Sequence, residues 1–166
     1  MNNNKVNVTT ACLKRVWSNP LHWLAFAGGA GCVPKAPGTA GTLVAIPLYL
    51  LAAPLPYWYF AGLTALMFLA GIAICDRCSR DLGVHDHPGI VWDEVVGYFV
   101  TMFAAPAGWL WWLAGFALFR LFDIWKPWPI RQLDVRVAGG FGIMLDDVVA
   151  GLFALAVLQL MAWLLV

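Results

Sequence analysis

Long apolar stretches without any charged residue alternate with short polar segments along this chain of 166 residues. Asp, Glu, Lys and Arg are absent from residues 36–75, 95–119 and 148–166. Proline-containing turns at 54–56 and 106–108 divide the first two of these stretches. An α-helix rises 1.5 Å per residue, so about 20 apolar residues cross the roughly 30 Å hydrocarbon layer of a membrane. The pattern therefore predicts an all-α, polytopic helical membrane protein with about four to five membrane-embedded helices, short hairpins and cytoplasmic polar loops.

The same pattern predicts the individual helices. The first full-length span runs from Tyr57 to Cys75 and begins with aromatic residues, which favour the membrane interface. The apolar segment 21–33 is too short to cross, so we expect it to lie on the surface or to re-enter. Residues 131–145, which follow two prolines and contain three glycines, are expected to form a loop. The predicted helices cover residues 42–53, 57–75, 92–105, 109–125 and 148–166.

The composition supports a membrane protein. Hydrophobic residues make up 62% of the chain and charged residues 11%, against about 45–50% and about 25% in ordinary soluble domains. One core of this size cannot hide so many apolar residues, so lipid is expected to cover them. The net charge of +1 gives no indication of a nucleic-acid partner. We expect a cytoplasmic tail at residues 1–20 and a single membrane domain at 21–166.

The location of the charges predicts the topology. All ten basic and nine acidic residues fall within segments 5–35, 76–94, 120–136 and 146–147. If the apolar stretches cross as hairpins, these segments all lie on one face of the membrane. Loops rich in Lys and Arg stay in the cytoplasm. We therefore expect a multi-pass protein whose active site faces the cytoplasm.

The four cysteines are too few for a disulfide scaffold. Cys12, Cys75 and Cys78 fall on the cytoplasmic, reducing side of the predicted topology. Cys75 and Cys78 form one CxxC, which without a second pair is weak evidence for zinc. We expect ordinary free thiols.

Carboxylates gather at the ends of three predicted helices. The segment GVHDHPGIVWDE at 83–94 ends in two adjacent acids at the start of an apolar run, where ionised groups need a partner charge or a metal. One more acid lies near the end of the helix at 109–125, two more precede the last helix, and hairpins would bring the three ends together. Oxygen ligands of this kind suit Mg²⁺. The predicted metal ligands are Asp93, Glu94, Asp123, Asp146 and Asp147.

Each of these acids also has a purely structural explanation. Acidic residues at helix N-termini are common caps that interact favourably with the helix dipole. Asp123 lies one turn from both Arg120 and Lys126, so it has ion-pair partners without a metal. Three acidic positions at one depth in so charge-poor a chain favour the metal, but both explanations stay open at this point.

Basic and hydroxyl residues beside the acids suit a phosphate group. Lys126 and Arg120 flank Asp123, and Lys35 lies in the glycine-bearing segment 34–42, whose backbone amides can face an anion. Taken singly, each basic residue is also explained as a topology anchor or a contact to lipid headgroups. The predicted phosphate or substrate ligands are Lys126, Arg120, Lys35, Thr39, Thr42 and Arg131.

The histidines of the segment 83–94 are candidates for proton transfer, because histidine titrates near neutral pH. An exposed turn that ends in Pro88 and Gly89 explains the same residues without chemistry. We favour His85 and Asp86 over His87. The predicted catalytic residues are Asp93, Glu94, Asp123, Asp147, His85 and Asp86.

Four sequence blocks carry a resemblance to a known family. They are PGTAGT at 37–42, GVHDHPGIVWDE at 83–94, FRLFDIWKPWPI at 119–130 and GGFGIMLDD at 139–147. Together and in this order they resemble the phosphatidylglycerophosphatase A family. The resemblance implies an all-helical, Mg²⁺-dependent phosphatase of the bacterial inner membrane. It further implies hydrolysis of phosphatidylglycerol phosphate to phosphatidylglycerol and inorganic phosphate, a step of phospholipid biosynthesis.

Several alternatives stay open. The nucleophile is either water or an aspartate, and the residues fix neither the number of metal ions nor the oligomeric state. The chain could also be a phosphatase or transferase for another phosphorylated lipid headgroup. A non-catalytic, ion-binding membrane subunit is a third possibility, although the uncharged stretches at 57–75 and 148–166 argue against a transport pathway.

Overall fold

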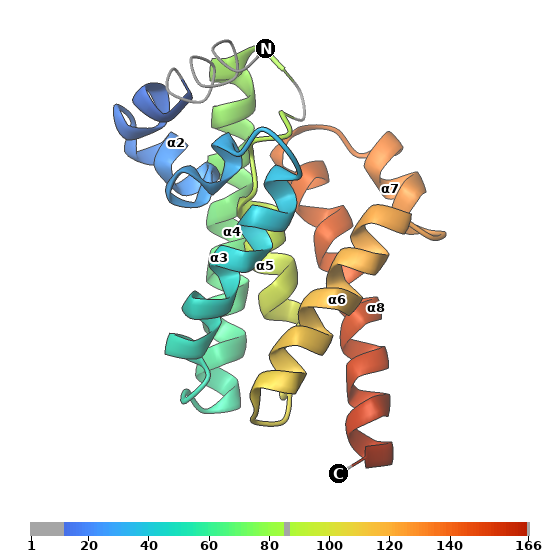
Figure 1. Ribbon diagram of the computed structural model, residues 1–166. Coiled ribbons are helices and arrows are strands. Elements are labelled where there is room, and N and C mark those ends of the chain that lie inside the picture. The colour runs from blue at the N-terminus through green and yellow to red at the C-terminus, as the bar shows by residue number, and fades with distance from the viewer. Residues whose placement is uncertain (1–11, 85–86, 166) are drawn as a thin grey trace.

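The computed structural model describes residues 12–84 and 87–165, which form a bundle of helices without any β-strand in those ranges (Figure 1). The predicted all-α class is therefore confirmed. A first helical segment covers residues 12–17. The elements that follow are α2 (Pro20–Ala25), the 3-10 helix η1 (Ala27–Cys32), α3 (Pro37–Ala52), α4 (Tyr57–Leu82), α5 (Trp92–Thr101), α6 (Trp109–Trp125), α7 (Ile130–Arg136) and α8 (Gly139–Leu165).

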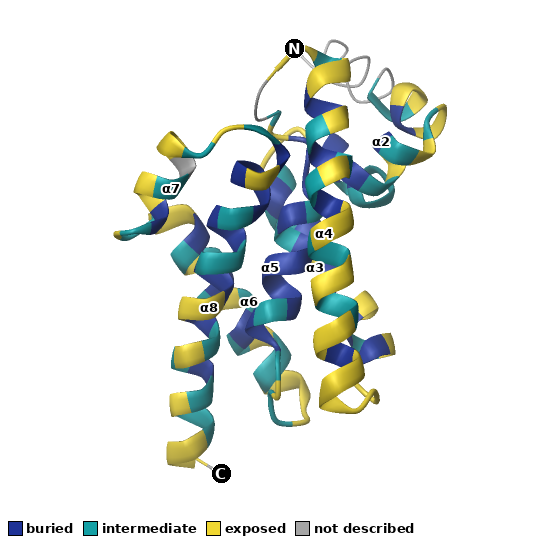
Figure 2. Ribbon diagram, turned by 180° about the vertical axis from the view of Figure 1, so that it is seen from behind, coloured by how far each residue is buried: buried dark blue, intermediate teal, exposed yellow. Residues whose placement is uncertain are grey.

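The helices α3, α4, α6 and α8 run up and down along the bundle, with the shorter α5 among them (Figure 1). One end of the bundle holds the C-terminal ends of α4 and α6 and the beginnings of α3, α5 and α8, and the described charged residues belong to these segments and to the elements packed beside them. We call this the polar end; α2, η1 and α7 pack there. α5 occupies the centre and contacts α3, α4, α6 and α8. Figure 2 shows α5 as mostly buried, whereas the other helices expose one side.

Two helix starts differ from the prediction, and two ends differ as well, since α4 continues to Leu82 rather than 75 and α5 stops at Thr101 rather than 105. α3 begins at Pro37 rather than at residue 42, because proline is well tolerated in the first helical turn. α8 begins at Gly139 rather than at 148, so the expected loop at 131–145 is wrong. The glycines that suggested a loop instead permit close packing. A Cβ on Gly140 would collide with the backbone carbonyl of Ile72 in α4.

Two helices, α4 and α8, are long and apolar enough to cross a membrane. α6 has the predicted bounds and 17 residues, α3 has 16 and α5 has 10. At 1.5 Å per residue α5 is only about 15 Å long, which is about half of the hydrocarbon thickness. By length and composition, the described helices therefore provide two candidate spans, and the four to five membrane-embedded helices stay a prediction.

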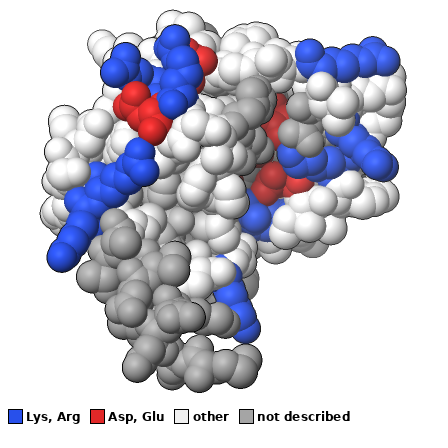
Figure 3. Space-filling view, turned by 90° about the horizontal axis from the view of Figure 1, so that it is seen from above, with Lys and Arg blue, Asp and Glu red and all other residues white. Residues whose placement is uncertain are grey.

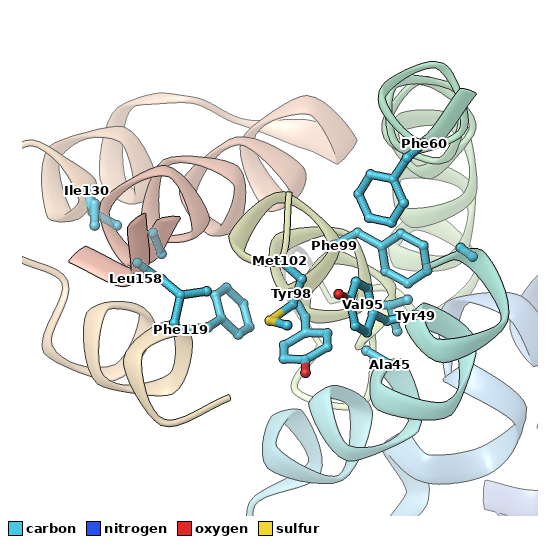
Figure 4. Packing of buried hydrophobic residues seen from close by; sticks show 13 residues of the cluster. Ala45, Tyr49, Phe60, Val95, Tyr98, Phe99, Met102, Phe119, Ile130 and Leu158 are labelled. Atoms are coloured by element: carbon cyan, nitrogen blue, oxygen red, sulfur yellow. The ribbon is translucent and has the colours of Figure 1, made fainter. Parts of the chain in front are cut away.

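Aromatic side chains pack around α5 in the core (Figure 4). Phe60 of α4 stacks on Phe99 of α5 with ring centroids 5.5 Å apart, and Tyr49 of α3 meets both rings edge-on. The hydroxyl of Tyr98 donates a hydrogen bond to the carbonyl of Trp112, at 3.1 Å. This buried polar group is thus satisfied, as apolar surroundings require.

The turn after α5 receives hydrogen bonds from a polar residue in the C-terminal third of α8. The Gln159 side-chain amide donates to the carbonyls of Phe103, at 2.9 Å, and Ala104, at 3.0 Å. Carbonyls that end a short helix in apolar surroundings need such a donor. Gln159 is therefore a structural partner of the α5 end.

The N-terminal segment is joined to η1 by a disulfide between Cys12 and Cys32. The expectation of a free thiol on the reducing side is therefore wrong for Cys12, which pairs with Cys32. Cys75 and Cys78 are buried free thiols in α4. The sequence spacing alone did not indicate the pairing, because the close approach depends on how residues 12–17 fold back onto η1.

Candidate active site

An acidic pocket opens at the polar end where α3, α5, α6 and α8 meet. Its volume is about 320 Å³. All five acids that were predicted to converge line it, so the hairpins bring the three helix ends together as expected. Figure 3 views the polar end from above and shows acidic atoms in a recess beside basic side chains. The charged residues of the acidic pocket are Asp93, Glu94, Arg120, Asp123, Lys126, Asp146 and Asp147.

Glycines at the crossing of α5 and α8 bring two of the aspartates together. A Cβ on Gly151 would lie 2.5 Å from the carbonyl oxygen of Gly97, so the two backbones touch at this point. Both helices start at the polar end. Asp93 and Asp147 each lie four residues, or about one turn, before their glycine. The close crossing therefore places the two carboxylates side by side.

Three carboxylates have the geometry of a cation site. One oxygen each from Asp93, Glu94 and Asp147 can be chosen so that all three lie within 4.8 Å of one another. Asp93 and Asp147 are buried, and the Glu94 side chain is only 13% exposed. Among the described residues, Glu94 Oε2 and Asp147 Oδ2 are buried without a hydrogen-bond partner. Buried carboxylates this close repel one another, and a hard divalent cation with oxygen ligands would compensate them.

The other two predicted ligands are held by basic residues. Asp123 forms an ion pair with Arg120, whose Nη1 also lies 3.8 Å from Oε1 of Glu94. Asp146 Oδ2 lies 2.6 Å from Nζ of Lys126. The ion-pair explanation therefore applies to Asp123 and Asp146, which lie outside the group of three.

Helix capping explains one of the two acidic pairs but not the other. Asp93 and Glu94 occupy the first turn of α5, where the helix dipole favours negative charge. Asp146 and Asp147 lie two turns inside α8, which begins at Gly139. The prediction that they stand at a helix N-terminus is wrong, because α8 extends to the glycines. Helix capping does not explain their burial.

Two residues that line the acidic pocket have a left-handed backbone. Lys126, at the C-terminal end of α6, has φ 44°, and Ala36, immediately before α3, has φ 51°. Non-glycine residues rarely adopt this conformation, and those that do cluster at functional sites. At Lys126 the chain leaves the helix axis while the side chain reaches Asp146 on α8.

The predicted phosphate ligands divide into two groups. Arg120 and Lys126 line the acidic pocket, but the other four, all of them described, do not. The Thr42 hydroxyl is buried and donates to the carbonyl of Gly38, at 2.9 Å, because residues 37–42 form the first helical turns of α3. Lys35 is exposed beside Ala36. The remaining two are Thr39, which is partly buried in α3, and Arg131, which is exposed on α7.

The predicted proton-transfer residues His85 and Asp86 fall outside the described residues. His87, which was less favoured, packs its ring against Phe26 with centroids 5.8 Å apart. Its Nδ1 accepts a hydrogen bond from the amide of Gly89 at 3.0 Å. His87 lines a different cavity of about 250 Å³ beside α2. The structure therefore places it apart from the acidic pocket.

Several small and apolar residues of the acidic pocket were not predicted. Their only signal in the sequence was their position inside, or directly beside, the four blocks quoted above. Gly38 stands out, because it leaves room for charged side chains from α5 and α6. These residues are Ala36, Pro37, Gly38, Pro88, Ile90, Ile124 and Ile143.

The chain is similar in sequence to known proteins. The family model described as phosphatidylglycerophosphatase A matches residues 23–162. The phosphatidylglycerophosphatase A of Escherichia coli is 46% identical over 142 residues, which are 85% of this chain and 83% of the relative. That of Haemophilus influenzae is 47% identical over 150 residues, 89% of this chain and 92% of the relative.

A third relative has a different description. A Bacteroides thetaiotaomicron protein described as "Putative phosphatidylinositol-3-phosphatase" is 39% identical over 146 residues, 81% of this chain and 89% of its own length. No solved structure matches the chain. The match of the family model over most of the chain, together with the first two relatives, shows that this protein belongs to the phosphatidylglycerophosphatase A family.

Proposed function

We propose that this protein hydrolyses phosphatidylglycerol phosphate to phosphatidylglycerol and inorganic phosphate in phospholipid biosynthesis. The observation that carries the proposal is the acidic pocket, where two buried carboxylates and the largely buried Glu94 lie beside Arg120 and Lys126. Anionic ligands for a cation next to two cationic side chains are the groups that phosphoryl transfer requires. Membership of the family supports the same reaction and substrate.

We further propose that the bundle lies in the bacterial inner membrane as a multi-pass protein. Exposed tryptophans at the polar end, Trp125 and Trp128, and exposed aromatics at the opposite end, Tyr57, Trp58 and Trp163, would form the two aromatic belts of a membrane protein. The shorter helices α3, α5 and α6 would be embedded between α4 and α8. The basic residues at the polar end support a cytoplasmic orientation of the acidic pocket. The disulfide between Cys12 and Cys32 lies at the same end and is the observation that opposes this orientation, because the cytoplasm is reducing.

Asp93, Glu94 and Asp147 are the proposed ligands of a Mg²⁺ ion. Their oxygen donors suit a hard cation, and two of them keep a buried oxygen without a hydrogen-bond partner in the described structure. A bound Mg²⁺ would neutralise charge on the phosphate oxygens. Asp123 and Asp146 would act through their ion pairs, by holding Arg120 and Lys126 against the acidic pocket.

Arg120 and Lys126 are the proposed phosphate ligands. A guanidinium binds phosphate oxygens in a planar fork, and an ammonium acts as a point charge. Their side chains are only 14% and 27% exposed, so little solvent screens them. They would stabilise the negative charge of the transferring phosphoryl group.

The hydrolysis breaks the bond between phosphorus and the glycerol oxygen. A water oxygen forms the new bond to phosphorus, and a proton from that water passes to the departing glycerol oxygen. The alternative is attack by an aspartate, followed by hydrolysis of an aspartyl phosphate. Rapid-quench experiments with substrate labelled in the terminal phosphate distinguish the two routes. Label trapped on the protein supports the aspartate, and its absence throughout turnover supports direct attack by water.

Phosphate release from purified protein in detergent micelles tests the proposed function. We expect turnover of phosphatidylglycerol phosphate with Mg²⁺, none after chelation, and a loss of at least about 100-fold in Asp147→Asn. Asp76→Asn is the matched control, because Asp76 pairs with Arg80 on α4 outside the acidic pocket. Equal activity of wild type and Asp147→Asn would remove Asp147 from the reaction.

The same assay separates the alternative functions. Another phosphorylated lipid, phosphatidylinositol 3-phosphate, serves as the competing substrate because of the description of the third relative. A higher kcat/KM for that lipid would assign the protein to a different lipid phosphatase. No phosphate release from any lipid would instead favour a non-catalytic, ion-binding protein.

A further inference from the structure

One side of α6 forms an apolar depression directly beside the acidic pocket. Four exposed residues spaced along the helix, Ala117, Leu121, Ile124 and Trp125, line it together with Arg120. Ile124 is 70% exposed, Leu121 53% and Trp125 68%. We call these four residues the α6 face.

The α6 face is continuous with the acidic pocket. Arg120 and Ile124 line both the depression and the pocket. Ile124 follows Asp123 directly and stands two residues before Lys126. The α6 face therefore lies next to a phosphate that is bound between Arg120 and Lys126. The apolar part of the same molecule can reach this face without passing any other charged group.

A second apolar groove lacks this continuity. It runs between α4, α5 and α8 and is lined by residues such as Phe60, Val100 and Leu152. It shares no lining residue with the acidic pocket. Of these two apolar surfaces, the α6 face is therefore the one that can bind the remainder of a molecule whose phosphate lies in the pocket.

We propose that the α6 face binds the glycerol backbone and the adjoining acyl-chain segments of the substrate lipid, which enters the acidic pocket sideways from the membrane. This inference rests on the proposed function. Removing acyl chains from the membrane exposes apolar surface to water, so a site for a lipid phosphate needs an opening toward the hydrocarbon. The α6 face provides that opening at the helix end that carries the phosphate ligands.

The position of Trp125 supports this orientation. An exposed indole favours the depth at which lipid ester groups lie, between headgroups and hydrocarbon. From Trp125 the α6 face extends about 12 Å along the helix to Ala117, deeper into the apolar part of the bundle. A phosphate at the pocket, a glycerol near Trp125 and acyl carbons near Leu121 would therefore follow the natural order of depth in a lipid.

A substrate comparison with matched variants tests the inference. Leu121→Asn places a polar group on the α6 face. Leu69→Asn makes the same change at a position of α4 that is 63% exposed and lines neither the acidic pocket nor the α6 face. Each variant is assayed on long-chain phosphatidylglycerol phosphate in mixed micelles and on its water-soluble dibutyryl analogue. The milder pair Leu121→Ala and Leu69→Ala covers the case in which asparagine prevents folding.

The measured quantity is the ratio of kcat/KM for the long-chain lipid to kcat/KM for the dibutyryl analogue. We expect Leu121→Asn to lower this ratio by about tenfold, mainly through KM, because the analogue lacks the acyl segments that contact the face. Leu69→Asn is expected to change it by less than about twofold. An unchanged ratio in Leu121→Asn, or an equal fall in both variants, overturns the inference. Wild-type protein that hydrolyses neither substrate overturns the proposed function, and the lipid site with it.

Discussion

Gly38 leaves the space that the carboxylate of Glu94 occupies. A Cβ on Gly38 would lie closer to Glu94 Oε1 than the 3.0 Å that real Cβ atoms keep, and 3.1 Å from Nη1 of Arg120. The missing side chain in the first turn of α3 thus lets two charged groups from other helices reach the acidic pocket.

We predict that Gly38→Ala lowers kcat/KM for phosphate release by about 100-fold, because a displacement of about 1 Å at a reacting site costs that much. The unfolding temperature should stay close to that of the wild type, since the ends of the charged side chains can move. Gly62→Ala is the control, because a Cβ there meets nothing within 4 Å. A fully active Gly38→Ala enzyme would show that the placement of Glu94 is unimportant.

Thermal unfolding tests the proposed metal ligands without relying on activity. Mg²⁺ at about 100 times its dissociation constant should stabilise the wild type by about 2.7 kcal/mol and raise its unfolding temperature. Asp147→Asn should lose this response, whereas Asp76→Asn should keep it, because Asp76 pairs with Arg80 away from the pocket. The same Mg²⁺ response in both variants would place the cation elsewhere.

Gln159 should contribute to stability through the end of α5. Gln159→Leu removes the donor to the carbonyls of Phe103 and Ala104, so we expect the free energy of unfolding to fall by about 1–3 kcal/mol. Denaturant unfolding in micelles measures the change. Gln132→Leu, on the exposed side of α7, is the control and should change little. A Gln159→Leu protein of wild-type stability would mean that another group satisfies these carbonyls.

A count of free thiols tests the disulfide between Cys12 and Cys32. Alkylation of the unfolded, unreduced chain should label Cys75 and Cys78, and after reduction it should label all four cysteines. Cys12→Ser should lower the free energy of unfolding by about 3 kcal/mol, because the bond closes a loop between residues 20 positions apart. Reductant should destabilise the wild type but leave Cys12→Ser unchanged. Four labelled thiols without reductant would contradict the pairing.

The apolar pattern predicted those parts of the fold that depend on local sequence. α6 has the predicted bounds because Gly108 precedes it and Pro127 follows Lys126, both of which stop a helix from extending. The convergence of the acids was also predictable, because short turns force consecutive helices to alternate in direction, which returns every second helix end to the same side of the bundle. Neither inference required knowledge of which side of each helix faces its neighbour.

The remaining features depend on helix rotation and on close backbone contacts. Asp146 and Asp147 are adjacent in sequence, yet one meets Lys126 and the other faces Asp93 and Glu94. The two side chains have different partners because of the rotation of α8 about its own axis. Hydropathy does not encode that rotation. The glycines at the start of α8 likewise resemble loop residues until a neighbouring backbone is known to lie against them.

The short central helix also constrains biosynthesis. With ten residues, α5 lacks the length of an independent membrane insertion signal, and it is enclosed by α3, α4, α6 and α8. α8 follows all of these helices in chain order, and Asp147 belongs to it. The nascent chain therefore cannot bring Asp93, Glu94 and Asp147 together before α8 has been made. The group of three carboxylates therefore forms only when α8, which is made after the other helices, docks against α5.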